Sequence, residues 1–403
     1  MALKFRSAKP RNWIIDCAQW LNAVDLLWRS RVQLGRHDLE NLGRIPQDAG
    51  LIIASNHADE MDIKVCMEIS KRSGRRFLYM INAEAFEEYL GWAGWWLRRL
   101  GGFSVERGGT DVRAKDYSVD VVKSGRDALV IFPEGEIHYL NDAVQPFKSG
   151  IVHIGMEALT EMRQTDPQWQ VYILPVSLKY RYRDPVAHEL DKRIQKMERT
   201  LFQKISHATF QERLLRLWAK RLRREDLLQK KDATSASFDA LKEAIHQTRR
   251  SILARIESKY PAEGLSPPKQ LKDRAQKLIF HLRERLSQKK FFSKETAKLL
   301  REDLEELKRV VHMEGWQPRY VDLHPSDERL AESVMKLERE LYGTKRPKPL
   351  ANRMVAVRIG EPILLGDFAS AYAQDARRTA QELTDLLRQK IQEQVQPSAS
   401  PLA

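Results

Sequence analysis

Short runs of apolar residues alternate with longer segments of helical periodicity over the first half of the chain. Buried strands are predicted at five places: 51–54, 75–81, 128–132, 171–176 and 353–363. Between them, apolar residues recur at helical spacing in 61–72, 111–125 and 147–163. This alternation predicts an α/β fold with a mostly parallel sheet flanked by helices.

The pattern changes after residue 181. No glycine occurs between Gly155 and Gly264, and charged residues alternate with leucine at helical spacing. A long helical insertion is therefore predicted to interrupt the α/β domain. The predicted division is an N-terminal amphipathic helical segment at 1–44, the first part of the α/β domain at 45–181, the insertion at 182–349, a closing strand and helix at 350–395 and a disordered tail at 396–403.

The strand at 51–54 is followed by a turn that carries one histidine and several carboxylates. His57 and Asp62 are five positions apart, so on one continuous helix they would point to different faces. They meet only if His57 lies in the turn and Asp62 in the first turn of the next helix. There Asp62 would fix the imidazole tautomer and leave the other ring nitrogen as a base. The alternative is a metal site formed by His57, Asp59, Glu60 and Asp62, which the lack of a nearby second histidine weakens.

Two other segments place polar groups beside predicted strands. The sequence GGFSVERGG at 101–109 presents Arg107 between glycines, and a guanidinium can hold a phosphate through two hydrogen bonds. Glu134 and Gly135 directly follow the strand at 128–132. Open α/β sheets bind ligands at the carboxyl ends of their strands, so we expect a site there.

Charge and composition then restrict the partners. The 403 residues carry a formal net charge of +14, which favours a membrane surface, nucleic acid or an acidic protein. Nucleic acid is the weakest of the three, because no recognised nucleic-acid module is present. The two cysteines, Cys17 and Cys66, provide no disulfide framework, and no apolar run approaches the length of a spanning helix. A reducing cytosolic setting is therefore expected.

Two segments are rich in tryptophan. Trp92, Trp95 and Trp96 precede a pair of arginines, a composition that suits the water–lipid boundary, although a buried aromatic cluster is the alternative. The amphipathic segment at 13–32 is equally consistent with a core-facing helix and with a helix on a membrane surface.

Together these segments resemble the conserved blocks of the glycerolipid acyltransferases, the family that contains lysophosphatidic acid acyltransferase. Asn56 and His57 with Asp62 are similar to its NHX4D motif. The remaining similar blocks are Gly102–Arg107, Phe132–Gly135, Leu174–Val176, Phe147–Gly150 and Ile359–Ile363. One departure concerns the residues after Gly135, where Glu136, Ile137 and His138 stand in place of the family's Thr and Arg.

The resemblance implies a glycerol-3-phosphate acyltransferase-like fold and an O-acyltransferase that acts on a lysophospholipid such as 1-acylglycerol-3-phosphate. His57 and Asp62 would then be catalytic, and Arg107, Glu134, Gly135, Asn56 and Pro175 would bind substrate. The donor would be acyl-CoA or acylated acyl carrier protein, with no cofactor and no metal. The expected partners are an anionic membrane surface, the lysolipid and acyl carrier protein, and the expected location is the inner face of the cell membrane. The competing hypotheses are a metal-dependent hydrolase and a non-catalytic peripheral membrane protein.

Overall fold

The computed structural model describes residues 5–109, 111–223, 235–260, 270–287, 293–344 and 346–396. The chain divides into two compact units. One is an α/β unit, and the other is a helical unit that comprises Arg107–Gly109 and Tyr182–Asn352. Of the predicted tail at 396–403, all residues after Gln396 lie outside the described part of the chain.

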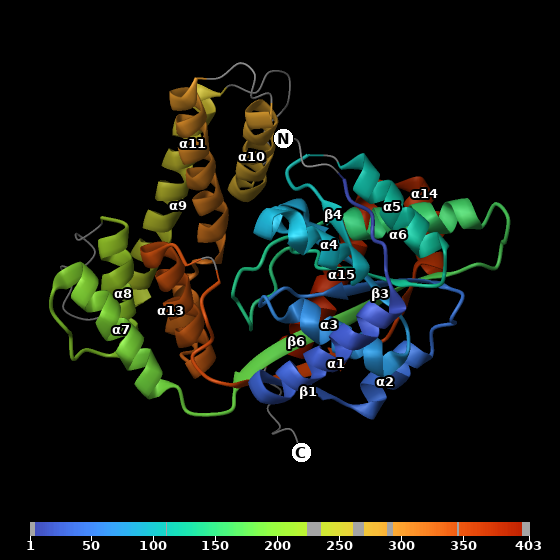
Figure 1. Ribbon diagram of the computed structural model, residues 1–403, viewed down its shortest axis with the longest axis horizontal. Helices are drawn as coiled ribbons and strands as arrows, with labels where there is room; N and C mark the ends of the chain where they lie inside the picture. Colours follow the sequence, from blue (N-terminus) through green and yellow to red (C-terminus); the bar gives the residue numbers. More distant parts are fainter. Residues whose placement is uncertain are drawn as a thin grey trace. The chain divides into compact units, whose positions relative to one another are not determined.

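The α/β unit contains one mostly parallel sheet (Figure 1). Its strands are β1 (Ser30–Leu34), β2 (Gly50–Ser55), β3 (Phe77–Asn82), β4 (Gly102–Val105), β5 (Ala128–Ile131), β6 (Val171–Tyr182), β7 (Arg353–Ile359) and β8 (Ile363–Leu364). The order is β1-β7-β6-β2-β5-β3-β4, with β8 antiparallel to β6. The predicted fold class, including the helical insertion, is confirmed.

Helices cover both faces of this sheet because the side chains of each strand alternate. Leu51 and Ile53 of β2 join the core that includes residues of α2 and α3, whereas Ile52 and Ala54 join the core formed with α5, α6 and α15. The helices of the unit are α1 (Asn12–Arg29), α2 (Arg36–Gly43), α3 (Asp62–Ser73), η1 (Ala83–Gly91), α4 (Trp92–Arg99), α5 (Val112–Lys123), α6 (Gly150–Met162), η5 (Leu365–Phe368), α14 (Ala369–Gln374) and α15 (Ala376–Val395).

One part of the sequence interpretation is wrong. The segment 1–44 was predicted to be helical, but β1 lies within it and pairs in parallel with β7, Val32 opposite Val355. Only every second residue of this short edge strand is sheltered, so its sequence lacks a continuous apolar run. Its pairing partner lies more than 300 residues further along the chain, which local periodicity cannot reveal.

The helical unit contains α7 (Ala187–Phe202), α8 (Phe210–Arg221), α9 (Ser235–Lys259), α10 (Leu271–Ser287), α11 (Lys294–His312), η4 (Met313–Gly315), α12 (Pro318–Leu323) and α13 (Asp327–Tyr342). Helices α9, α10 and α11 share a core that includes Leu253, Leu282 and Leu307, all fully buried. Side chains at the helix starts accept backbone N–H groups: Thr209 caps α8, Ser293 caps α11 and Ser326 caps α13. No described helix of the chain is long and apolar enough to cross a bilayer.

Candidate active site

His57 and Asp62 come together just beyond the carboxyl end of β2. Residues 56–61 form the turn that follows the strand, and Asp62 is the first residue of α3. The Nδ1 atom of His57 lies 2.8 Å from Oδ2 of Asp62. The same oxygen accepts the Asp59 N–H at 3.0 Å, so it acts as an acceptor and the Nδ1–H of His57 is the donor. This tautomer leaves the Nε2 lone pair of His57 available for a proton.

The imidazole of His57 is held on several sides. Its ring stacks on Phe132 with centroids 4.2 Å apart and an interplanar angle of 17°. The His57 N–H donates at 2.9 Å to Oε1 of the buried Glu134. The side chain is 11% exposed, and within the described residues no group is hydrogen-bonded to Nε2. A substrate hydroxyl that approached His57 would therefore meet an oriented, unoccupied ring nitrogen.

Asp62 is fully buried and accepts three hydrogen bonds. The third donor is the hydroxyl of Tyr180 on β6, 2.5 Å from Oδ1. Burial raises the pKa of Asp62 above its ordinary value, whereas the hydrogen bond from His57 opposes that increase. Three donors around one carboxyl group favour its ionised form, in which it can stabilise an imidazolium at His57.

A buried ion pair adjoins this carboxylate. Arg353, the first residue of β7, donates to both carboxylate oxygens of Asp59 at 2.8 and 3.0 Å. Its guanidinium also lies 4.6 Å from the ring centroid of Tyr180. Burial alone would raise the pKa of Asp59, but the charge and hydrogen bonds of Arg353 lower it below its ordinary value. Arg353 thus contacts two of the groups that surround Asp62.

Asn56, predicted as a substrate-binding residue, anchors the turn to the neighbouring strand. Its Nδ2 donates to the Leu178 carbonyl at 2.9 Å, and its Oδ1 accepts the Leu178 N–H at 2.8 Å. This pair of bonds continues the β2–β6 ladder beyond Ser55, which stands opposite Val176. The side chain of Asn56 therefore fixes the position of the backbone that leads into His57.

The other predicted substrate-binding residues occupy different places. Glu134 uses its second oxygen to accept the Gln145 N–H at 3.3 Å, and Gly135 forms the turn after β5 with a φ of +74°. Pro175 is buried within β6. It pairs with Ala54, which is the residue before the last one of β2. Arg107 belongs to the helical unit together with Gly108 and Gly109. A substrate contact by any of these residues stays a prediction.

The proposed metal ligands do not converge. Asp59 is engaged by Arg353, and Asp62 is engaged by His57 and Tyr180. In the described part of the chain, no three His, Cys, Asp or Glu side chains are placed to hold a metal ion. In the HADEMD segment, hydrogen bonds thus join Asp62 to His57, Asp59 and Tyr180, and join Asp59 to Arg353.

Sequence reasoning missed Tyr180 and Arg353. Tyr180 could have been found by extending the strand at 171–176, because Leu174, Val176, Leu178 and Tyr180 keep the period of two. Arg353 gave no local signal, since it lies almost 300 residues from its partner Asp59.

The predicted membrane residues lie on α4. Trp92, Trp95 and Trp96 are 68%, 41% and 48% exposed, so the alternative of a buried aromatic cluster does not describe them. The Arg99 guanidinium lies 3.8 Å from the ring centroid of Trp95. Their contact with lipid stays a prediction.

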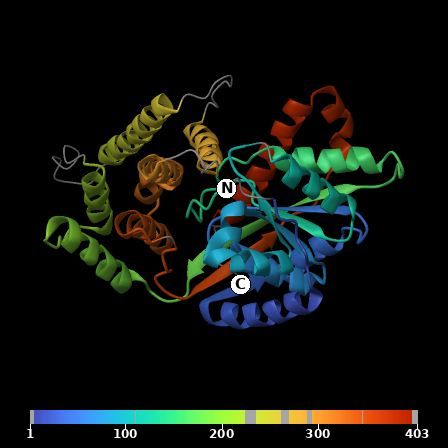
Figure 2. The same ribbon diagram turned by 45° about the horizontal axis from the view of Figure 1, so that its top comes forward.

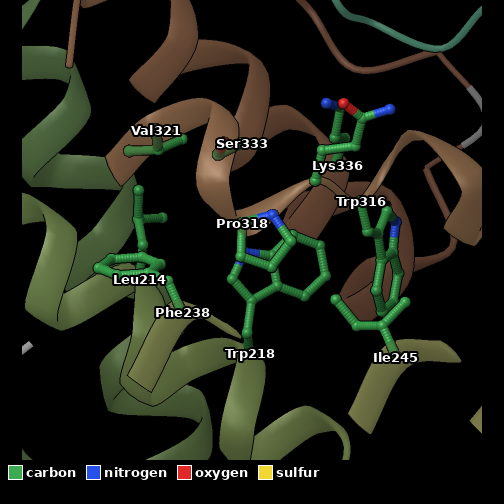
Figure 3. A pocket seen from close by; sticks show the side chains of 10 residues that line it. Leu214, Trp218, Phe238, Ile245, Trp316, Pro318, Val321, Ser333 and Lys336 are labelled. Atoms are coloured by element: carbon green, nitrogen blue, oxygen red, sulfur yellow. The ribbon is translucent and has the colours of Figure 1, made fainter. Parts of the chain in front are cut away.

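The helical unit has a separate small cavity (Figure 3). Its walls are mostly apolar, and the Trp218 and Trp316 ring centroids are 4.1 Å apart. The cavity volume of about 20 Å³ has room for about one water molecule. None of the residues predicted from the sequence to form the site lines it.

Comparison with known proteins shows what this region of the chain is similar to. Residues 36–179 match a family model described as Acyltransferase. A 1-acyl-sn-glycerol-3-phosphate acyltransferase of Streptococcus pneumoniae (strain ATCC BAA-255 / R6) is 30% identical over 116 residues. That alignment covers 28% of this chain and 41% of the relative, so the chain spans less than half of the length of the curated protein it matches.

Proposed function

We propose that the chain is an O-acyltransferase that moves a fatty acyl group from a thioester donor to a hydroxyl group of a lysophospholipid such as 1-acylglycerol-3-phosphate. The observation that carries this proposal is the His57–Asp62 pair, 2.8 Å apart at a strand end, inside a domain of the acyltransferase family. The similarity to the pneumococcal enzyme supports the choice of acceptor.

The proposed mechanism uses His57 first as a base and then as an acid. Nε2 removes the proton of the acceptor hydroxyl while its oxygen attacks the thioester carbonyl carbon. The tetrahedral intermediate then expels the thiolate, which takes the proton from Nε2, so the ester and the thiol are released and His57 returns to its neutral form. Asp62 stabilises the imidazolium during this cycle, and Glu134 fixes the backbone that carries the ring. The donor is acyl-CoA or acylated acyl carrier protein.

Replacing the base gives the most direct test. We expect His57→Ala to lower kcat by about 1,000-fold or more and Asp62→Asn to be nearly as severe, because the imidazole loses its base or its orienting charge. Acyl transfer from both donors to purified lysophosphatidate measures this. His37→Ala on α2 is the control, since that side chain is 77% exposed. Near-normal turnover by folded His57→Ala protein would exclude this mechanism.

A second experiment addresses the acceptor phosphate. We propose that Arg107 holds it through two hydrogen bonds, which a lysine cannot reproduce. Arg107→Lys should raise the KM for the acceptor by about tenfold and leave the KM for the donor within a factor of about two. Steady-state kinetics with each substrate varied in turn separate the two constants. Equal changes in both would remove Arg107 from the phosphate site.

We further propose that the protein acts peripherally at the cytoplasmic membrane surface. The exposed tryptophans of α4 and the net charge of +14 support this, because indole rings favour the interface and cations favour anionic lipids. High salt should weaken vesicle binding without abolishing it, since only the electrostatic contribution is screened. Sedimentation with vesicles at increasing salt measures both contributions.

A further inference from the structure

Helix α1 is apolar on two sides, although only one of them is covered. Ile14, Ile15 and Leu26 are at most 9% exposed, and Asn22 anchors the same side by donating at 2.8 Å to the Lys64 carbonyl of α3. An ordinary surface helix would be polar on its other side. The exposed side of α1 is instead rich in large apolar residues.

Large apolar residues recur on that opposite side at intervals of three, four and seven positions. This surface, named here the α1 stripe, consists of Trp13, Trp20, Leu21, Val24, Leu27 and Trp28, exposed by 67%, 64%, 61%, 41%, 65% and 74%. Isolated exposed apolar residues are normal, but a continuous row along a whole helix marks an interaction surface. In Figure 2, α1 is the dark blue helix at the lower edge of the α/β unit.

The start of α1 adjoins the end of α4, where the other exposed tryptophans lie. The Lys9 N–H donates to the Arg98 carbonyl at 2.8 Å, and the Arg11 N–H donates to the Arg99 carbonyl at 3.1 Å. Two backbone hydrogen bonds therefore join the segment that leads into α1 to the last turn of α4. Trp13, the first residue of the α1 stripe, follows this junction by two positions.

The chemistry of this stripe favours a lipid surface over a second protein chain. Three of its six residues are tryptophan, which is enriched at membrane–water interfaces. Exposed arginines flank the helix at both ends, Arg11 before it and Arg29 and Arg31 after its last apolar residue. Eighteen residues extend about 27 Å, so a helix lying flat would place both groups of cations at the level of the headgroups.

We propose that α1 lies in the plane of an anionic bilayer, with the α1 stripe inserted at the level of the interface. The stripe is a second and longer docking element than the α4 tryptophans of the proposed function. It shares the lipid partner of that function, yet its insertion requires no acyl transfer. The two can therefore be tested separately.

The chain contains its own reporter position. Cys17 is exposed and follows Trp13 by four positions, on the same side of α1, whereas Cys66 is fully buried. A thiol-reactive fluorophore sensitive to polarity can therefore be attached to Cys17 of the full-length His57→Ala chain. On vesicles of phosphatidylcholine with 30 to 50% phosphatidylglycerol, about the range that gives a strong surface charge, its emission should shift to shorter wavelength, and quenchers attached to lipid chains should reduce it.

Two pairs of leucines give a matched comparison. Leu21→Ser with Leu27→Ser removes part of the stripe, where the leucines are 61% and 65% exposed. Leu299→Ser with Leu323→Ser is the control, at helical-unit leucines that are 51% and 62% exposed. We expect the first pair to weaken vesicle partitioning by about tenfold or more and the control pair to stay within about twofold.

The outcomes separate the alternatives. A Cys17 probe that keeps its aqueous emission on every vesicle overturns the proposal, as does normal partitioning of the Leu21→Ser, Leu27→Ser variant. A lipid-free emission shift that follows protein concentration, with a doubled mass in sedimentation, would identify a second copy as the occupant and also overturn it. Acyl transfer to a monomeric, short-chain lysolipid tests the proposed function independently, and the stripe variant should retain that activity.

Discussion

Arg353 of the α/β unit and Lys336 of the helical unit are equally buried cations in very different surroundings. Each residue is 6% exposed, and each side chain lies over a tyrosine ring, Tyr180 at 4.6 Å and Tyr320 at 5.7 Å. Arg353 donates two hydrogen bonds to the Asp59 carboxylate, whereas Lys336 donates at 2.8 Å to the Gly315 carbonyl. Arg353 is therefore part of an ion pair, whereas Lys336 is hydrogen-bonded to an uncharged carbonyl group.

The consequence differs for each group. Arg353 lowers the pKa of Asp59, so the pair remains charged at neutral pH, and it lies against the tyrosine that donates to Asp62. Burial lowers the pKa of Lys336 to about 8, because the charge of Glu332 offsets only part of the desolvation. Burial of a cation is therefore no indication of function by itself. What distinguishes Arg353 is its contact with the groups that position the dyad.

Among substitutions of these two cations, the largest effect on stability and on kcat is expected at Arg353. Arg353→Met leaves Asp59 buried without its guanidinium, which should destabilise the fold by about 3 kcal/mol and lower kcat by about 100-fold. Lys336→Met is the matched control and should leave kcat unchanged. Denaturant unfolding and acyl transfer measure the two properties.

A double variant separates folding from positioning. Asp59→Asn with Arg353→Met removes both charges and should recover most of the stability, while kcat stays low because Tyr180 has lost its cation. Full recovery of kcat would show that Arg353 matters only for the fold. In wild-type protein the ion pair stabilises the fold above pH 3.8, and that stability is lost as the pH falls through the lower pKa of folded Asp59.

A smaller effect is expected from Tyr180→Phe. The variant deprives Asp62 of one donor, so its carboxylate is less stable and its pKa rises further. We expect kcat to fall by about tenfold and the acidic limb of the pH–rate profile to move to higher pH. Tyr320→Phe in the helical unit is the comparison and should leave the profile unchanged. An unshifted acidic limb in Tyr180→Phe would remove that tyrosine from the positioning of the dyad.

The sequence predicted the local part of this site and missed the distant part. His57, Asp62 and Glu134 follow apolar runs, so period and turn chemistry are sufficient to place them at strand ends. Arg353 follows the helical insertion, and only the β1-β7-β6-β2 order brings it to Asp59. Strand β1 was missed for the same reason, because its pairing is non-local.

The exposed stripe of α1 shows a different limit. Its periodicity predicts the helix, but it is equally consistent with a core-facing helix and with a helix on a membrane surface. The structure shows that the side with Ile14 and Leu26 is buried, whereas the other apolar side is exposed. Periodicity identifies amphipathic elements reliably only when one side is polar.

The smallest effect is expected at Lys336 and concerns stability alone. At pH 7 this lysine is charged in both the folded and the unfolded chain, and the folded state bears the full cost of burying the charge. Between pH 8 and 10.5 the folded protein releases the proton while the unfolded chain retains it, so the penalty disappears as the pH rises. Lys336→Met should therefore stabilise the protein at pH 7 by about 1 to 2 kcal/mol, after the loss of the bond to Gly315 is deducted. Unfolding measured at pH 7 and pH 10 should show this gain shrinking toward zero. A gain that is equal at both pH values would mean that folding does not lower the pKa of Lys336, so the lysine stays charged in both states, and the contrast with Arg353 would then lie in the partner alone.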